Sequence, residues 1–178
     1  MKIMKMFGWL IVGCLFYVCP NAMGQTVFSG QLLGAGASDP ELGGILAQNQ
    51  APVAFVVTSA SVTIAASGKW KSTITGLVVP TVGTGGITQI AEALVCGGKI
   101  VANTESVALS TAGNAKIKTT VTGIPSRCVA PAVFVYVTEI DGVSVGLTST
   151  PPTQYIAVTG FTTSSSTDSD PPEGNPEK

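Results

Sequence analysis

Three segments of the chain alternate apolar and polar residues with a period of two. In residues 115–121, Ala115 and Ile117 alternate with Lys116 and Lys118, and similar alternation runs through residues 61–66 and 69–77. Successive side chains of a β-strand point to opposite faces, so each segment predicts a strand with one buried face. The lysines then lie on the solvent side.

Other segments are apolar on both faces or end in strong turn signals. Residues 133–137 predict a central strand because both of its faces are apolar. Gly97-Gly98 and Asp141-Gly142 each predict a tight reversal between two strands. Further expected strands cover 27–33, 52–58, 94–96, 99–102, 106–109, 143–147 and 155–161, and residues 38–41 predict the start of a helix of one or two turns.

Short strands separated by Gly and Pro turns predict an all-β fold, a single antiparallel β-sandwich over residues 25–161. The architecture is broadly similar to that of immunoglobulin-like domains. The immunoglobulin signature is missing, however, because Trp70 precedes both Cys96 and Cys128 instead of lying between them.

The two ends of the chain differ in composition from this body. Residues 1–24 predict a secretory signal: Lys2 and Lys5 precede an apolar run, and Ala22-Met23-Gly24 is a small-x-small cleavage site. We expect a secreted or periplasmic protein that starts at Gln25 and has no membrane span. The alternative is a lipid anchor at Cys14. Residues 162–178, rich in Ser, Thr, Pro and acid, predict a disordered acidic tail.

Two cysteines remain after removal of the signal, and they predict a disulfide. Cys14 and Cys19 leave with the signal, whereas Cys96 and Cys128 stay in the mature chain. Two cysteines in an exported protein are more often paired than free. There is no Cys-x-x-Cys motif that would indicate redox or metal chemistry.

The balance of basic and acidic side chains in residues 25–161 limits the class of partner that we expect. Residues 25–161 contain six basic and six acidic side chains, so nucleic acid is not an expected partner. A neutral, hydroxyl-rich surface predicts binding to a protein or glycan surface by shape and hydrogen bonds, with little dependence on salt.

The sequence predicts no catalytic, cofactor-binding or metal-binding residue. Gly142-Val143-Ser144-Val145-Gly146 fits a hydrolase motif, but the chain has no histidine to act as a base for Ser144. Histidine is also the commonest metal ligand. The acidic pairs that could bind calcium have simpler roles at a helix start, a hairpin and the tail; they are Asp39 with Glu41, Glu139 with Asp141, and Asp168 with Asp170.

Two functions from different classes follow. The first is an exported, non-enzymatic module that binds a surface or forms part of an extracellular assembly. The alternative is a carboxylate-dependent hydrolase of an extracellular polymer, built from Glu92, Glu105 and Glu139. The hydrolase requires two carboxyl groups roughly 5 to 9.5 Å apart in one cleft.

Overall fold

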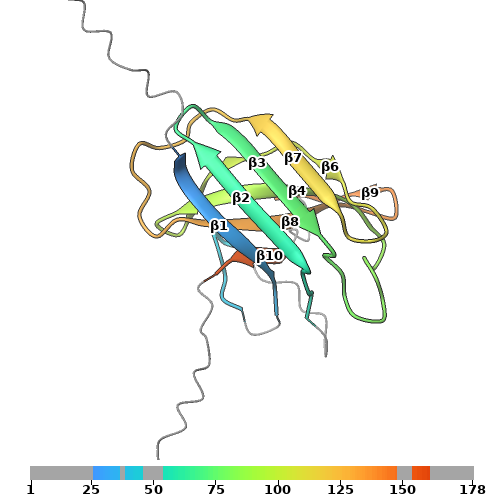
Figure 1. Ribbon diagram of the computed structural model, residues 1–178. Helices are drawn as coiled ribbons and strands as arrows, with labels where there is room; N and C mark the ends of the chain where they lie inside the picture. The colour runs from blue at the N-terminus through green and yellow to red at the C-terminus, as the bar shows by residue number, and fades with distance from the viewer. Residues whose placement is uncertain (1–25, 37–38, 46–53, 148–153, 161–178) are drawn as a thin grey trace, which may run out of the picture.

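A computed structural model describes residues 26–36, 39–45, 54–147 and 154–160, and these residues form ten strands (Figure 1). The strands are β1 (Thr26–Gly34), β2 (Ser59–Ala65), β3 (Lys69–Thr75), β4 (Ile87–Cys96), β5 (Lys99–Asn103), β6 (Val107–Ala108), β7 (Ala115–Thr120), β8 (Ala132–Ile140), β9 (Val143–Ser144) and β10 (Tyr155–Thr159). A search of the described residues finds no helix that is long and apolar enough to cross a membrane. The predicted signal and the predicted tail lie outside the described residues.

The strands form one antiparallel sheet that curls into a half-barrel. Their order is β5-β4-β8-β10-β1-β2-β3-β7, with β6 paired to β4 and β9 paired to β8. Strand β1 connects the two halves of the sheet, because its residues 26–31 pair with β2 and its residues 32–34 pair with β10. The all-β class and the antiparallel pairing are confirmed, whereas a sandwich of two separate sheets stays a prediction.

The curl buries one large core between the two halves of the sheet. Trp70, Ile74 and Ile64 from β2 and β3 belong to the same apolar cluster as Ile90 and Val135 from β4 and β8. A second cluster covers the outer face of β4, β8 and β10. There Phe134 packs against Tyr136 and Tyr155, and the Tyr155 hydroxyl donates to the Pro40 carbonyl at 2.5 Å.

The alternating segments fold as predicted because one face of each strand is buried and the other is solvated. Trp70, Ser72 and Ile74 are buried on β3, and the residues between them are exposed. Ala115 and Ile117 are buried on β7, and their lysine neighbours are exposed. The turns are also confirmed: Gly97 and Gly98 connect β4 to β5, and Asp141 and Gly142 connect β8 to β9, all with positive φ.

The local predictions for residues 38–41, 52–58 and 143–147 were wrong in whole or in part. In the described part of 52–58, residues 54–58 form only an isolated bridge between Val56 and Val78, because the Phe55 and Thr58 amides donate to Ala35 and Thr75 instead of extending the pairing with Val78. Residues 39–45 form no helix. Gly43 and Gly44 adopt positive φ and close a reversal in which Leu42 and Ile45 exchange backbone hydrogen bonds. Strand β9 is also shorter than the predicted 143–147.

The predicted disulfide is confirmed. Cys96 at the end of β4 bonds to Cys128 in the connection between β7 and β8, with a Cα–Cα distance of 5.1 Å. Next to it, the Gly97 amide donates to the Val129 carbonyl at 2.7 Å. The bond therefore attaches the long connection to the β4–β5 hairpin.

We predict that Gly68→Ala is much more destabilising than Gly98→Ala. Both glycines have similar positive φ, +81° and +78°, but a Cβ on Gly68 would lie 2.0 Å from the Val121 carbonyl oxygen, whereas one on Gly98 would meet open space. Backbone strain should cost about 1 to 2 kcal/mol in each variant, and the overlap at Gly68 should add about 1 to 3 kcal/mol. Urea unfolding of both variants measures the difference. Equal losses would show that the contact with Val121 is unimportant.

Candidate functional site

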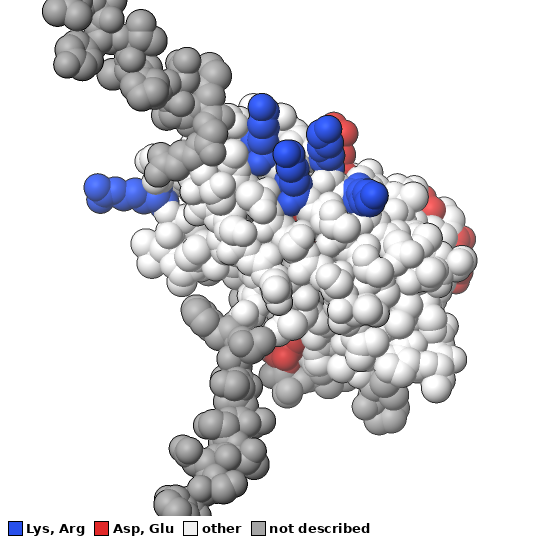
Figure 2. Space-filling model, viewed as in Figure 1, with Lys and Arg blue, Asp and Glu red and all other residues white. Residues whose placement is uncertain are grey.

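Four lysines lie together on the outer surface of two neighbouring strands. Lys71 on β3 is directly opposite Lys118 on β7, Lys69 is opposite Thr120, and Lys116 is opposite Thr73. All four lysines are exposed, and Figure 2 shows basic side chains gathered on the face turned to the viewer, where β3 and β7 lie in Figure 1. We call these four residues the lysine face.

Folding stability does not explain this arrangement. Like charges directly opposite each other across a sheet are destabilising. Within the described part of the chain, none of the four lysines forms an ion pair. Lysines on an edge strand do block unwanted pairing with other sheets, which could explain β7. It does not explain Lys69 and Lys71, because β3 lies between β2 and β7 in the interior of the sheet.

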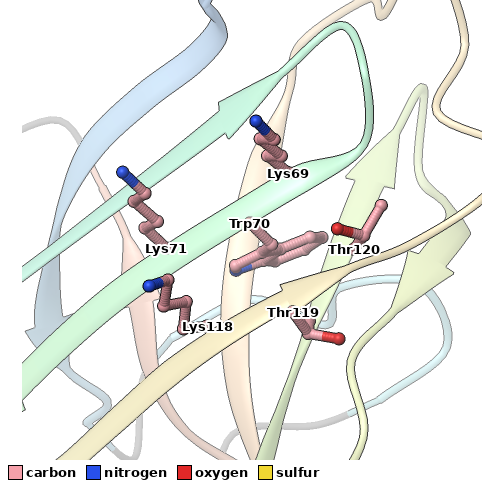
Figure 3. A pocket seen from close by; sticks show the side chains of 6 residues that line it. All are labelled: Lys69, Trp70, Lys71, Lys118, Thr119 and Thr120. Carbon is pink, nitrogen blue, oxygen red and sulfur yellow. The ribbon is translucent and has the colours of Figure 1, made fainter.

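A shallow depression opens between these side chains. Lys69, Lys71 and Lys118 line it together with Trp70, Thr119 and Thr120, and its volume is about 380 Å³. In Figure 3 the three lysines extend from one side of the strands, while the Trp70 indole extends to the opposite side. Strand spacing is roughly 5 Å and alternate residues are about 7 Å apart, so the ammonium groups are held close enough to contact one ligand together.

Hydroxyl and amide side chains continue the lysine face across the sheet. Opposite residues of antiparallel strands point to the same face, and the pairing places two rows side by side. The first row is Ser29, Thr63, Lys71 and Lys118, and the second is Gln31, Ser61, Thr73 and Lys116. Neither row contains an acidic residue. These two rows are therefore basic over β3 and β7 and polar but uncharged over β1 and β2.

A carboxyl group is buried directly beneath this surface. Glu92 on β4 is fully buried, and its oxygens accept hydrogen bonds from the Trp70 indole at 2.5 Å and the Ser72 hydroxyl at 2.6 Å. Burial raises the pKa of Glu92 to about 7, although the two hydrogen bonds from Ser72 and Trp70 act in the opposite direction. These bonds join β3 to β4, which are not neighbours in the sheet.

The three glutamates of the hydrolase hypothesis lie in different environments. Glu92 is enclosed in the core, whereas Glu105 is exposed after β5. Glu139 on β8 accepts hydrogen bonds from Thr88 at 2.6 Å and Gln89 at 2.7 Å. A polymer cannot reach the Glu92 carboxyl in this structure, so Glu92 cannot form half of a catalytic pair.

The other candidate residues have local structural roles. Ser144 lies on the exposed strand β9, which is followed by no helix in the described residues up to 147. The Asp39 carboxylate accepts the Gly36 amide at 2.8 Å. Among the described residues there is no group of three His, Cys, Asp or Glu side chains that could hold a metal ion. Asp168 and Asp170 lie outside the described residues.

Sequence reasoning found part of this site. Alternation correctly placed Lys116 and Lys118 in solvent, but it could not show that β3 and β7 are neighbours. Glu92 had a usable signal: it is a single acid inside the apolar run Ile90-Ala91-Glu92-Ala93-Leu94. A charge in such a run indicates a carboxyl group held by buried donors.

Comparisons with protein-family models, with curated proteins and with solved structures return no match for this chain.

Proposed function

We propose that this protein is an exported, non-catalytic binding module whose lysine face holds an anionic partner. The observation that carries the proposal is the juxtaposition of Lys69, Lys71, Lys116 and Lys118 on adjacent strands, with Lys71 opposite Lys118. The folded body acts as a sandwich-like scaffold in a secreted or periplasmic setting, and residues 162–178 act as a solvated spacer. The disulfide is compatible with an oxidising compartment.

The position of the charges changes the expected mode of binding. Formal charge in residues 25–161 sums to zero, which by itself predicts binding that is nearly independent of salt. Four of the six bases lie on one face, however, and a concentrated charge attracts an anionic partner at close range. Because exposed charges are screened within about 10 Å at 0.1 M salt, we now expect binding to weaken as salt rises.

The hydrolase alternative has weaker support. It needs an accessible pair of carboxyl groups, and Glu92 is fully buried. Glu139 is already engaged by Thr88 and Gln89. A binding role requires only the exposed side chains of β3 and β7 on a rigid sheet.

We predict that Lys71→Gln/Lys118→Gln weakens binding to immobilised dextran sulfate at least tenfold. The substitution removes the two opposed charges at the centre of the lysine face. Surface plasmon resonance at 50 and 300 mM salt measures the affinity of the chain from Gln25 to Lys178. Wild-type protein should bind more weakly at the higher salt, and the salt dependence should be smaller in the variant.

The matched control is Lys99→Gln/Arg127→Gln. It changes the net charge by the same amount, and both residues are exposed but lie away from β3 and β7, on β5 and in the β7–β8 connection. This control should bind nearly as tightly as wild type. Equal losses in the two variants would mean that net charge alone is responsible, and unchanged binding in Lys71→Gln/Lys118→Gln would refute the proposal.

A further inference from the structure

We infer that the anionic partner is a linear acidic polysaccharide that lies along β3 and β7, an inference that rests on the proposed function. The four lysines form a diagonal stripe, because Lys69, the Lys71–Lys118 pair and Lys116 occupy three successive rows of the sheet. With rows about 7 Å apart, the stripe extends roughly 14 Å along the strands. A linear polymer with regularly spaced acid groups matches this stripe.

The chemistry of the lysines suits acid groups without fixed geometry. Each ammonium group is a compact charge with three donors on a flexible stem, whereas arginine favours planar, bidentate recognition. All four basic residues of this surface are lysines. They can therefore follow carboxylate or sulfate groups that vary in orientation from one sugar to the next.

The uncharged side chains beside the stripe suit sugar hydroxyls. Ser59, Ser61 and Thr63 lie on β2, the next strand from β3, and their partners across the pair are Thr75, Thr73 and Lys71. Their short hydroxyl side chains can donate and accept hydrogen bonds. They also protrude little from the sheet, so a sugar chain can approach the backbone closely while its acid groups contact the lysines.

The same surface lacks features that two other classes of polyanion usually require. Single-stranded nucleic acids are usually held by aromatic side chains that stack on bases, and amphipathic elements that insert into a membrane surface use large apolar side chains. Among the described residues of β1, β2, β3 and β7, the exposed large apolar side chains are Val27 and Leu33, and both lie on β1. Strand β2 separates them from the strands that carry the lysines.

The experiment compares polyanions of different class at equal concentrations of anionic groups. The probes are polygalacturonate, dextran sulfate, neutral dextran, poly-L-glutamate, duplex DNA and phosphatidylglycerol vesicles, with the chain from Gln25 to Lys178. At least one of the acidic polysaccharides should bind tenfold more tightly than poly-L-glutamate, DNA or the vesicles, and neutral dextran should not bind. The two acidic polysaccharides distinguish a carboxylate from a sulfate as the recognised group.

Two variants separate the charge from the hydroxyl contribution. Lys71→Gln/Lys118→Gln should weaken polysaccharide binding at least tenfold, with Lys69→Gln/Lys116→Gln as a second variant in case the first folds poorly. Ser61→Ala/Thr63→Ala should weaken polysaccharide binding about threefold to tenfold and leave any binding of poly-L-glutamate unchanged. Near-ultraviolet circular dichroism checks that each variant is folded.

The outcomes distinguish this inference from the proposed function. If DNA, vesicles or poly-L-glutamate bind more tightly than both acidic polysaccharides, and the lysine variants abolish that binding, the polysaccharide inference is wrong and the lysine face is still an anion-binding surface. If Ser61→Ala/Thr63→Ala leaves polysaccharide binding unchanged, the hydroxyl contacts are refuted and with them the inference. If no polyanion binds, or if every folded lysine variant binds like wild type, both proposals fail.

Discussion

The free energy of unfolding should fall by about 3 kcal/mol between pH 4.5 and pH 8.5, and Glu92→Gln should remove most of this fall. The cause is the burial of Glu92, which raises the pKa of this carboxyl from 4.5 to about 7. The folded protein then binds the proton more tightly than the unfolded chain does. Each unit of difference between the folded and unfolded pKa values corresponds to about 1.36 kcal/mol, so this shift contributes about 3 kcal/mol.

The sign follows from the direction of the shift. A carboxyl group with a raised folded-state pKa contributes most to stability when it is protonated in both states, below about pH 4.5. Above that pH the unfolded chain loses its proton first, and the contribution falls. It is lost as the pH passes through about 7, because ionised Glu92 is then confined in the core. Urea unfolding at several pH values measures this curve.

Glu92→Gln is a conservative test because the hydrogen bonds can be kept. The amide oxygen can accept from the Trp70 indole, and the amide nitrogen can donate to the Ser72 hydroxyl, which can act as an acceptor. Glutamine does not titrate, so the variant should show a much flatter pH curve. Glu105→Gln is the control, because Glu105 is exposed and its loss should leave the wild-type slope. A wild-type slope in Glu92→Gln would refute the assignment to Glu92.

Tryptophan fluorescence gives an independent measurement of the same event. The chain contains two tryptophans, and Trp9 falls in the predicted signal, so Trp70 alone reports in a chain that starts at Gln25. The Trp70 indole donates directly to the Glu92 carboxyl. Its emission should therefore change with a midpoint near pH 7 in the folded protein, and Glu92→Gln should remove the change.

The fold was predictable where local pattern determines structure. Alternation determined which faces of β3 and β7 are buried, because a half-buried strand repeats every two residues. Gly97-Gly98 and Asp141-Gly142 were recognisable because only a few residues adopt positive φ without strain. The isolated bridge at Val56 was not predictable, since its apolar neighbours look like those of a strand.

The candidate site depended on pairing between distant segments, which local pattern does not reveal. Lys71 and Lys118 are 47 residues apart in the sequence and meet only because β3 pairs with β7. In the same way, Glu92 receives its donors from β3 across the curl of the sheet. Charge balance therefore suggested a neutral surface, whereas the fold gathers four of the six bases on two adjacent strands.

Cys96→Ala/Cys128→Ala should lower the free energy of unfolding by about 2 to 4 kcal/mol. The two cysteines are 32 residues apart in the sequence, and a closed loop of this size restricts the unfolded chain by about 4 kcal/mol in the chain-entropy account. The double substitution avoids leaving one reactive thiol. Urea unfolding of the variant and the wild type measures the difference.

The disulfide should matter locally as well as globally. Cys128 lies near the end of the connection between β7 and β8, and the described residues 121–131 of this connection form no strand. Backbone hydrogen bonds attach this connection at its two ends, from Val121 to Gly68 and from Gly97 to Val129. Without the covalent bond, the Gly97 amide, which donates to the Val129 carbonyl, should exchange with solvent much faster, while the amides of β3 should change only with global stability.

Reduction of the wild-type protein separates the bond from the packing of its sulfur atoms. Both cysteines pack against the main core, so alanine removes some apolar contact along with the bond. Wild type with a reducing agent keeps the sulfur atoms and loses the bond, and it should account for most of the destabilisation seen in the variant. If reduced and oxidised wild type unfold at the same urea concentration, the disulfide does not stabilise this fold. Two free thiols in exported material would show that the bond does not form in the native compartment.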